Sequence, residues 1–361
     1  MKGSVKIIIA AFFMMFVHFN VFSKGISDGI LKGIAAHLLG ISTRELAYLK
    51  ALPDFNNAVA KFSPDGNKIA AGYYSGEIII WDAHTYNPVS VYKGENDYFS
   101  LDFSPDGKYI AYGARYEAVT LFDVENNCVV KTFPVERSGI PEAVKFSPDG
   151  RYIAAGYTVH RIIIWDVETG GTVYRFEASN SVESVAFSPD GKSLISADAD
   201  YGIDIWNMEN GSHEKRLTGD FRYDKFSAVI YRAIFDKSGD RIISGSKIRR
   251  EITIWDTKSG EIVKTLPGNR NSVYSLCVSP NGNILASGSM NQIRLWDISS
   301  GKLLLNISKK FLFEVASLDF SPTNNNILIT AGSPDGLIKL WDITNGELIT
   351  ELSIDRILTD R

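Results

Sequence analysis

The feature that most constrains this chain is a short segment that recurs seven times. Each copy is an apolar run that ends in an aromatic residue and a small acid or amide, as in IIIWD at 78–82. The aromatic residues are separated by 41, 43, 41, 49, 41 and 45 positions, and they include all six tryptophans of the chain. The signature residues are Trp81 and Asp82, Phe122 and Asp123, Trp165 and Asp166, Trp206 and Asn207, Trp255 and Asp256, Trp296 and Asp297, and Trp341 and Asp342. Repeats of this length indicate a chain built from one supersecondary unit.

A second motif, F-S-P-D-G, precedes each signature. It is complete at 62–66, 103–107, 146–150 and 187–191, and altered at 235–239, 278–282 and 320–324. Proline presets its own φ, aspartate bonds to nearby backbone and glycine accepts a positive φ, so the motif predicts a tight turn. Short apolar runs lie on both sides of this turn, and a fourth run follows each signature. Each repeat therefore predicts four short antiparallel strands.

A single four-stranded sheet of this kind cannot cover its own faces. Seven sheets arranged radially bury each face against the next sheet. The sequence thus predicts an all-β, seven-bladed β-propeller of four-stranded antiparallel blades over residues 54–354. The third strands are expected at 78–82, 119–123, 162–166, 203–207, 252–256, 293–297 and 338–342. The aromatic residue that ends each third strand is expected to fill the wedge between neighbouring blades.

These motifs identify a family resemblance: over roughly residues 54–354 the chain resembles the WD-repeat β-propellers. Members of that family often carry a Gly-His pair before the first strand of a blade, and here Gly268 is followed by Asn269 instead. Most blades are therefore expected to depend on apolar packing and strand hydrogen bonds. The resemblance implies that a partner docks on the face made by the turns between second and third strands and by the loops between blades.

The N-terminal segment predicts export. Two lysines precede an apolar run that is too short to span a bilayer as a helix, which is typical of a secretory signal peptide over 1–23. The expected location is periplasmic or extracellular, and an uncleaved membrane anchor is the alternative. Residues 24–53 predict an amphipathic helical segment, although 45–52 could instead form a ring-closing strand. Residues 355–361 would form a C-terminal tail.

The composition excludes several classes of function. The chain has 38 basic and 42 acidic residues, a net charge of −4, which argues against a nucleic-acid binder. Its two cysteines, Cys128 and Cys277, are expected in distant strands and too few for a disulfide framework. The three histidines of the repeats fall at unrelated positions, so no nucleophile, acid–base or metal constellation is predicted. We therefore expect a non-enzymatic, monomeric protein without cofactor or metal.

Tyrosine and arginine are concentrated in the turns and loops predicted to form one propeller face. These residue types are over-represented at protein-interface hot spots. A roughly eight-residue insertion between the fourth and fifth blades adds further aromatic and charged side chains. The predicted protein-binding residues are Tyr74, Arg115, Tyr116, Tyr157, His160, Tyr201, Phe221, Arg222, Tyr223, Arg249, Arg250 and Arg270. The sequence thus predicts an exported platform that binds a protein or peptide. The alternatives are a propeller that binds a small ligand or envelope glycan at the channel mouth, and turns that are merely exposed.

Overall fold

The computed structural model describes residues 58–94, 98–114, 118–135, 139–200, 202–218, 230–246, 250–266, 271–290, 292–308, 314–332 and 336–353. The chain divides into two compact units, residues 1–55 and 56–361, and the described residues all belong to the second. The predicted signal peptide, the helical segment at 24–53 and the C-terminal tail lie outside them. Within these ranges every regular element is a strand. The described part of the chain contains no helix long and apolar enough to cross a membrane.

The second unit consists of seven four-stranded antiparallel sheets, here called blades 1 to 7 in chain order. Blade 1 is β1 (Ala58–Phe62), β2 (Lys68–Tyr73), β3 (Glu77–Asp82) and β4 (Pro88–Lys93). Blade 2 is β5 (Tyr98–Phe103), β6 (Tyr109–Ala114), β7 (Val119–Asp123) and β8 (Cys128–Phe133). Blade 3 is β9 (Pro141–Phe146), β10 (Tyr152–Tyr157), β11 (Arg161–Asp166) and β12 (Thr172–Glu177).

The other four blades repeat this order. Blade 4 is β13 (Val182–Phe187), β14 (Ser193–Asp198), β15 (Gly202–Asn207) and β16 (His213–Thr218). Blade 5 is β17 (Ile230–Phe235), β18 (Arg241–Ser246), β19 (Ile252–Asp256) and β20 (Ile262–Leu266). Blade 6 is β21 (Val273–Val278), β22 (Ile284–Ser289), β23 (Gln292–Asp297) and β24 (Leu303–Ile307). Blade 7 is β25 (Ser317–Phe320), β26 (Ile327–Ala331), β27 (Ile338–Asp342) and β28 (Glu347–Leu352).

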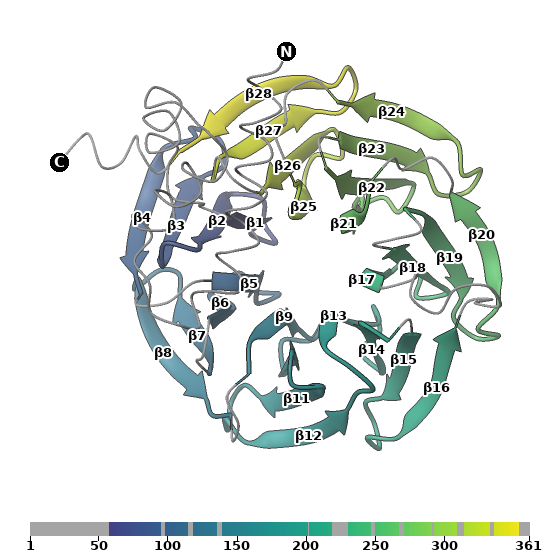
Figure 1. Cartoon of the computed structure of the whole chain (residues 1–361). Helices are drawn as coiled ribbons and strands as arrows, with labels where there is room; N and C mark the ends of the chain where they lie inside the picture. The colour runs from purple at the N-terminus through teal and green to yellow at the C-terminus, as the bar shows by residue number, and fades with distance from the viewer. Residues whose placement is uncertain are drawn as a thin grey trace, which may run out of the picture. The chain divides into compact units, whose positions relative to one another are not determined.

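The blades form a closed ring with the first strand of each at the centre (Figure 1). Blade 7 packs against blade 1, because β1 contacts both β25 and β26. Each blade takes its four strands from one continuous stretch of chain, blade 7 included. The predicted all-β, seven-bladed propeller of four-stranded antiparallel blades is confirmed.

The signature aromatics lie in the core between blades, as predicted. Trp81 packs with Ile338 and Leu340 of blade 7, and Phe122 packs with Ile78 and Ile80 of blade 1. Burial of such large side chains is the main favourable contribution to folding. Each blade is therefore fixed to the preceding blade by its own aromatic residue.

The F-S-P-D-G turns have the predicted chemistry. In blade 1 the Ser63 hydroxyl donates to Asp65 Oδ1 at 2.6 Å and accepts the backbone N–H of Lys68 at 2.9 Å. The glycine of the blade 3 turn, Gly150, has a φ of 74°, a conformation that favours glycine. The hydroxyl of Ser63 also lowers the pKa of Asp65. These local bonds fix the connection between first and second strands.

Candidate functional site

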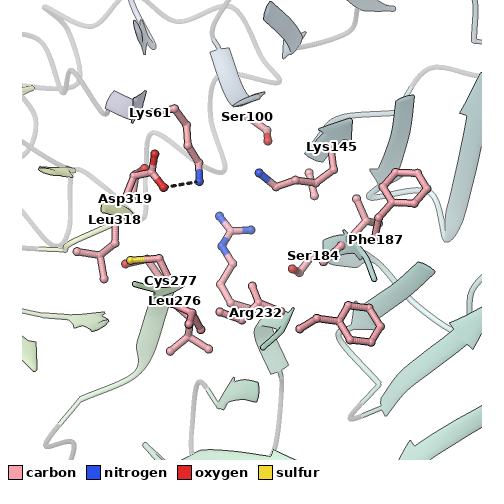
Figure 2. A pocket seen from close by; sticks show the side chains of 18 of the residues that line it. Lys61, Ser100, Lys145, Ser184, Phe187, Arg232, Leu276, Cys277, Leu318 and Asp319 are labelled. Carbon is pink, nitrogen blue, oxygen red and sulfur yellow. Dashed lines mark hydrogen bonds and ion pairs between the residues drawn. The ribbon is translucent and has the colours of Figure 1, made fainter. Parts of the chain in front are cut away.

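The first strands of the seven blades enclose a central cavity of about 400 Å³. That volume is within the usual range for small-molecule sites. Every blade contributes to its lining, so the cavity is the channel of the propeller (Figure 2). The channel is therefore the first candidate site.

Two layers of side chains define the channel, because residues two apart on a strand point the same way. The lysine layer consists of one residue from the first strand of each blade, the residue just before the phenylalanine or valine that begins the F-S-P-type turn. The serine layer consists of the residues two positions earlier on the same strands. The lysine layer is, in blade order, Lys61, Asp102, Lys145, Ala186, Ile234, Cys277 and Asp319. The serine layer is Val59, Ser100, Ala143, Ser184, Arg232, Ser275 and Ser317. All of these except Asp102 line the cavity.

The lysine layer is divided into a charged arc and an apolar arc. Around the ring, blades 7, 1, 2 and 3 contribute Asp319, Lys61, Asp102 and Lys145, which alternate in sign. The next three blades contribute an alanine, an isoleucine and a cysteine. The channel is thus amphipathic across its width.

Two matching interblade ion pairs stabilise the charged arc. Asp319 of blade 7 accepts Lys61 Nζ at 3.2 Å and the Phe62 backbone N–H at 2.9 Å, both from blade 1. Asp102 of blade 2 accepts Lys145 Nζ at 2.6 Å and the backbone N–H of the following phenylalanine in blade 3 at 3.1 Å. The first of these pairs joins the last blade to the first.

The two ion pairs influence one another. Burial disfavours the charged ammonium of Lys61, but the carboxylates of Asp319 and Asp102 outweigh it and raise the pKa of Lys61. Burial lowers the pKa of Lys145, and repulsion from Lys61 acts in the same direction although Asp102 opposes it. The two ammonium groups therefore lie near enough to repel each other across the channel.

The serine layer joins blades through hydroxyl groups. The Ser317 hydroxyl donates to the Ala60 carbonyl at 3.0 Å, and that of Ser275 donates to the Val315 carbonyl at 2.7 Å. Arg232 is the one long side chain in this layer. A β-bulge lies just before it in β17, and equivalent register shifts precede the layer's residues in blades 2, 3, 4 and 6. Such bulges re-aim a side chain, and here Arg232 points into the channel (Figure 2).

The channel cysteine is not a reactive thiol. Cys277 lies buried in β21, and burial raises the pKa of its thiol. Cys128 is exposed in β8 of a different blade, so the two remain free cysteines, as their predicted strands required. In the part of the chain that the structure describes, no group of three or more His, Cys, Asp or Glu side chains could hold a metal ion.

A second polar cluster, in blade 4, is structural. The Arg216 guanidinium donates to both carboxylate oxygens of Asp198 at 3.0 Å and also to Asp204. His213 Nε2 lies 2.7 Å from Asp204 Oδ1, and its ring meets the edge of Trp206. Asp198 is 1% exposed and fully paired, so it is not available to a cation.

Few of the predicted protein-binding residues lie within the described ranges. His160 and Arg250 are exposed, and Tyr74 is half-buried. Tyr157 is fully buried, so its prediction as a surface residue is wrong. It is the last residue of β10, which is buried on both faces from Ile153 onward, and it packs in the same cluster as Ile153 and Ala155. The remaining predicted residues are outside the described ranges, namely Arg115, Tyr116, Tyr201, Phe221, Arg222, Tyr223, Arg249 and Arg270.

His160 and Arg250 share an unusual backbone conformation. Each stands five residues before its signature tryptophan, in the turn between second and third strands, and each has a φ of 60°. Blades 1 and 7 place Gly76 and Gly336 at this position. A side chain there is strained, and such strain is concentrated at functional sites.

Sequence reasoning missed the channel ion pairs, although a signal for them exists. The hexapeptide SLDFSP occurs at 100–105 and again at 317–322, in blades 2 and 7. The segment KFSPDG occurs at 61–66 and 145–150, in the blades that follow them in the ring. Each SLDF strand thus precedes a KF strand, and that pairing forms the two ion pairs.

Comparison with known proteins identifies the repeats. A family described as WD domain, G-beta repeat matches residues 57–82, 127–166, 170–207, 260–297 and 308–342. Periodic tryptophan protein 2 of Arabidopsis thaliana is 25% identical over 308 residues, which is 84% of this chain and 26% of that protein. Eukaryotic translation initiation factor 3 subunit I of Neurospora crassa is 35% identical over 95 residues, which is 26% of this chain and 27% of the relative. The periodic tryptophan protein 2 homolog of Schizosaccharomyces pombe is 32% identical over 97 residues, 27% of this chain and 11% of that protein.

These relatives overturn the prediction of an exported protein in the periplasm or outside the cell. One of them is named as a subunit of a translation initiation factor, and translation initiation takes place inside the cell. The alignments span about a quarter or less of each of these relatives.

Proposed function

We propose that this chain, which belongs to the WD-repeat β-propeller family, is a non-enzymatic platform that binds a partner protein through the face containing His160 and Arg250. WD-repeat propellers typically act as scaffolds for protein–protein interaction. The factor 3 relative is itself named as a subunit. That the chain is monomeric and binds no nucleic acid stays a prediction.

The conformation of the two turns carries this proposal. His160 and Arg250 come from blades 3 and 5, and both expose a polar side chain at a position where two other blades use glycine. Tyr86 and Asn127 also have a positive φ, but in third-to-fourth turns, so the support comes from the shared, exposed position of His160 and Arg250 and not from strain alone. Both turns lie at the same end of their blades, because antiparallel strands place all second-to-third turns on one face.

The test is affinity capture with the full chain as bait, in extracts of the cells that express it. One variant carries His160→Glu and Arg250→Glu. The matched control carries Lys108→Glu and Lys192→Glu, two exposed lysines in first-to-second turns at the opposite end of the strands. Circular dichroism melting establishes that both variants fold.

We expect the first variant to lose a specific partner by about tenfold or more, the effect of losing one interface hot spot. The control variant should retain that partner. Equal recovery by all three baits would contradict the assignment of this face. Absence of any specific partner from the folded wild-type bait would contradict the platform itself.

A further inference from the structure

Three cationic side chains converge in the channel from three different blades. Lys61, Lys145 and Arg232 come from blades 1, 3 and 5 and point into the same cavity (Figure 2). Each lysine has one carboxylate partner that also accepts a backbone N–H. The three cations therefore share two carboxylates, which leaves an excess of positive charge in the two layers.

Arg232 is the cation without a carboxylate. Its Nη1 donates to the backbone carbonyl of Glu183 at 2.7 Å, and among the described residues no carboxylate forms an ion pair with it. A guanidinium has five N–H donors in a planar fork, so most of its donors stay available. Like charges that converge in a partly buried space destabilise the protein unless an anion compensates them.

The geometry of the three donors restricts the anion. They approach from three directions around the ring, and a planar carboxylate presents only two oxygen atoms. A phosphate group presents oxygen atoms in three or more directions. Arginine and lysine together are the usual protein groups that bind phosphate.

The remaining cavity wall indicates that the ligand has an organic part. Opposite the charged arc, the lining is Ala186, Ile234, Leu276 and Cys277. A phosphate group alone is much smaller than the cavity of about 400 Å³. A small apolar substituent on the phosphate would bury these side chains.

From these observations we infer that the channel binds a small organic molecule through a phosphate group, or another tetrahedral oxyanion, held between Lys61, Lys145 and Arg232. The inference does not depend on the proposed protein partner. It also distinguishes this site from a neutral-glycan site, which would not need three converging cations.

The experiment is calorimetric titration of the full chain with inorganic phosphate, phenyl phosphate and benzoate at fixed ionic strength. We expect phenyl phosphate to bind one to one and more tightly than the other two. Arg232→Gln should weaken its binding by about 10- to 100-fold, as expected for lost hydrogen bonds to a charged group. Lys108→Gln, an exposed lysine outside the channel, is the matched control and should leave the affinity unchanged.

A second variant and a melting experiment guard against misfolding. Ala186→Phe fills the apolar side of the cavity, so it should weaken phenyl phosphate more than inorganic phosphate. The free Arg232→Gln protein should melt at or above the wild-type temperature, because it removes a charge without breaking an ion pair. Absence of phosphate binding by the wild type, equal affinity for benzoate, or an unchanged affinity in Arg232→Gln would each overturn the inference.

Discussion

Blades 4 to 7 and blades 1 and 3 use the same signature tryptophan in two different ways. In blades 4 to 7 the indole N–H donates to a hydroxyl on the second strand at 2.9 to 3.0 Å; the acceptors are Ser196, Ser244, Ser287 and Thr330. In blades 1 and 3 the equivalent residues are Ala71 and Ala155, two positions after the residue paired with the tryptophan. The N–H groups of Trp81 and Trp165 have no hydrogen-bond partner in the described structure.

This difference between the blades shows that the repeat does not require a hydrogen bond from its signature aromatic residue. A buried donor left without a partner costs about 1–3 kcal/mol, and blades 1 and 3 accept that cost. Blade 2 avoids this cost because the buried side chain of Phe122 carries no N–H group. The shape and apolar area of the ring are therefore the common requirement, and the hydroxyl adds stability where it is present. Four blades thus add one Trp–hydroxyl bond to the apolar packing and strand hydrogen bonds that the sequence predicts.

The largest expected effect comes from removing a hydroxyl. Ser287→Ala leaves the Trp296 N–H buried and unpaired, and should lower the free energy of unfolding by about 1–3 kcal/mol. Urea denaturation measures this change. In a Trp296→Phe background the same Ser287→Ala substitution should cost much less, because no donor remains. An equal cost in both backgrounds would show that Ser287 acts by packing alone.

A smaller effect of opposite sign is expected from adding a hydroxyl. Ala155→Ser gives the Trp165 N–H the acceptor that blades 4 to 7 already have, and should raise the free energy of unfolding by about 0.5–1.5 kcal/mol. Ala154→Ser is the matched control, because it adds the same atom on the other side of the strand. If Ala155→Ser destabilises the protein as much as this control, the unpaired Trp165 N–H does not lower the stability of blade 3.

The smallest expected effect comes from the residue after the signature aromatic, which is an uncharged asparagine in blade 4 and an aspartate in the other blades. Hydroxyl and backbone donors of Ser300 and Ser299 lower the pKa of Asp297 from an ordinary 3.8 to about 2. Its contribution to stability is thus complete above the ordinary pKa and lost as the pH falls toward 2. Blade 4 places Asn207 at this position, where its side-chain oxygen accepts the same kind of backbone N–H bonds without titrating.

This charge difference can be measured with a reciprocal pair of variants. Asp297→Asn should make the acid-side loss of stability shallower, and Asn207→Asp should make it steeper, in urea denaturation at successive pH values. Identical pH profiles for the two variants would show that the turn carboxylates do not contribute to the acid-side loss.

The fold follows from sequence because its determinants are local and repeated. Six tryptophans and Phe122 at one position, together with seven turns, specify seven similar sheets. The binding residues are harder to predict, because exposure depends on where a strand ends and on how the neighbouring blades cover it. Tyr157 was expected at the surface but is the last residue of β10, which is buried on both faces between neighbouring blades. His160, three residues later, is exposed.

The sequence by itself determined the number of blades, the strands in each and the aromatic wedge between neighbours. These properties depend on short-range alternation and turn chemistry, which a single repeat already contains. Only the tertiary structure brought Lys61 to Asp319 across 258 positions and turned three cations toward one cavity. The physical reason is ring closure: the channel exists only when all seven first strands meet, and no local pattern states which charges will then face one another.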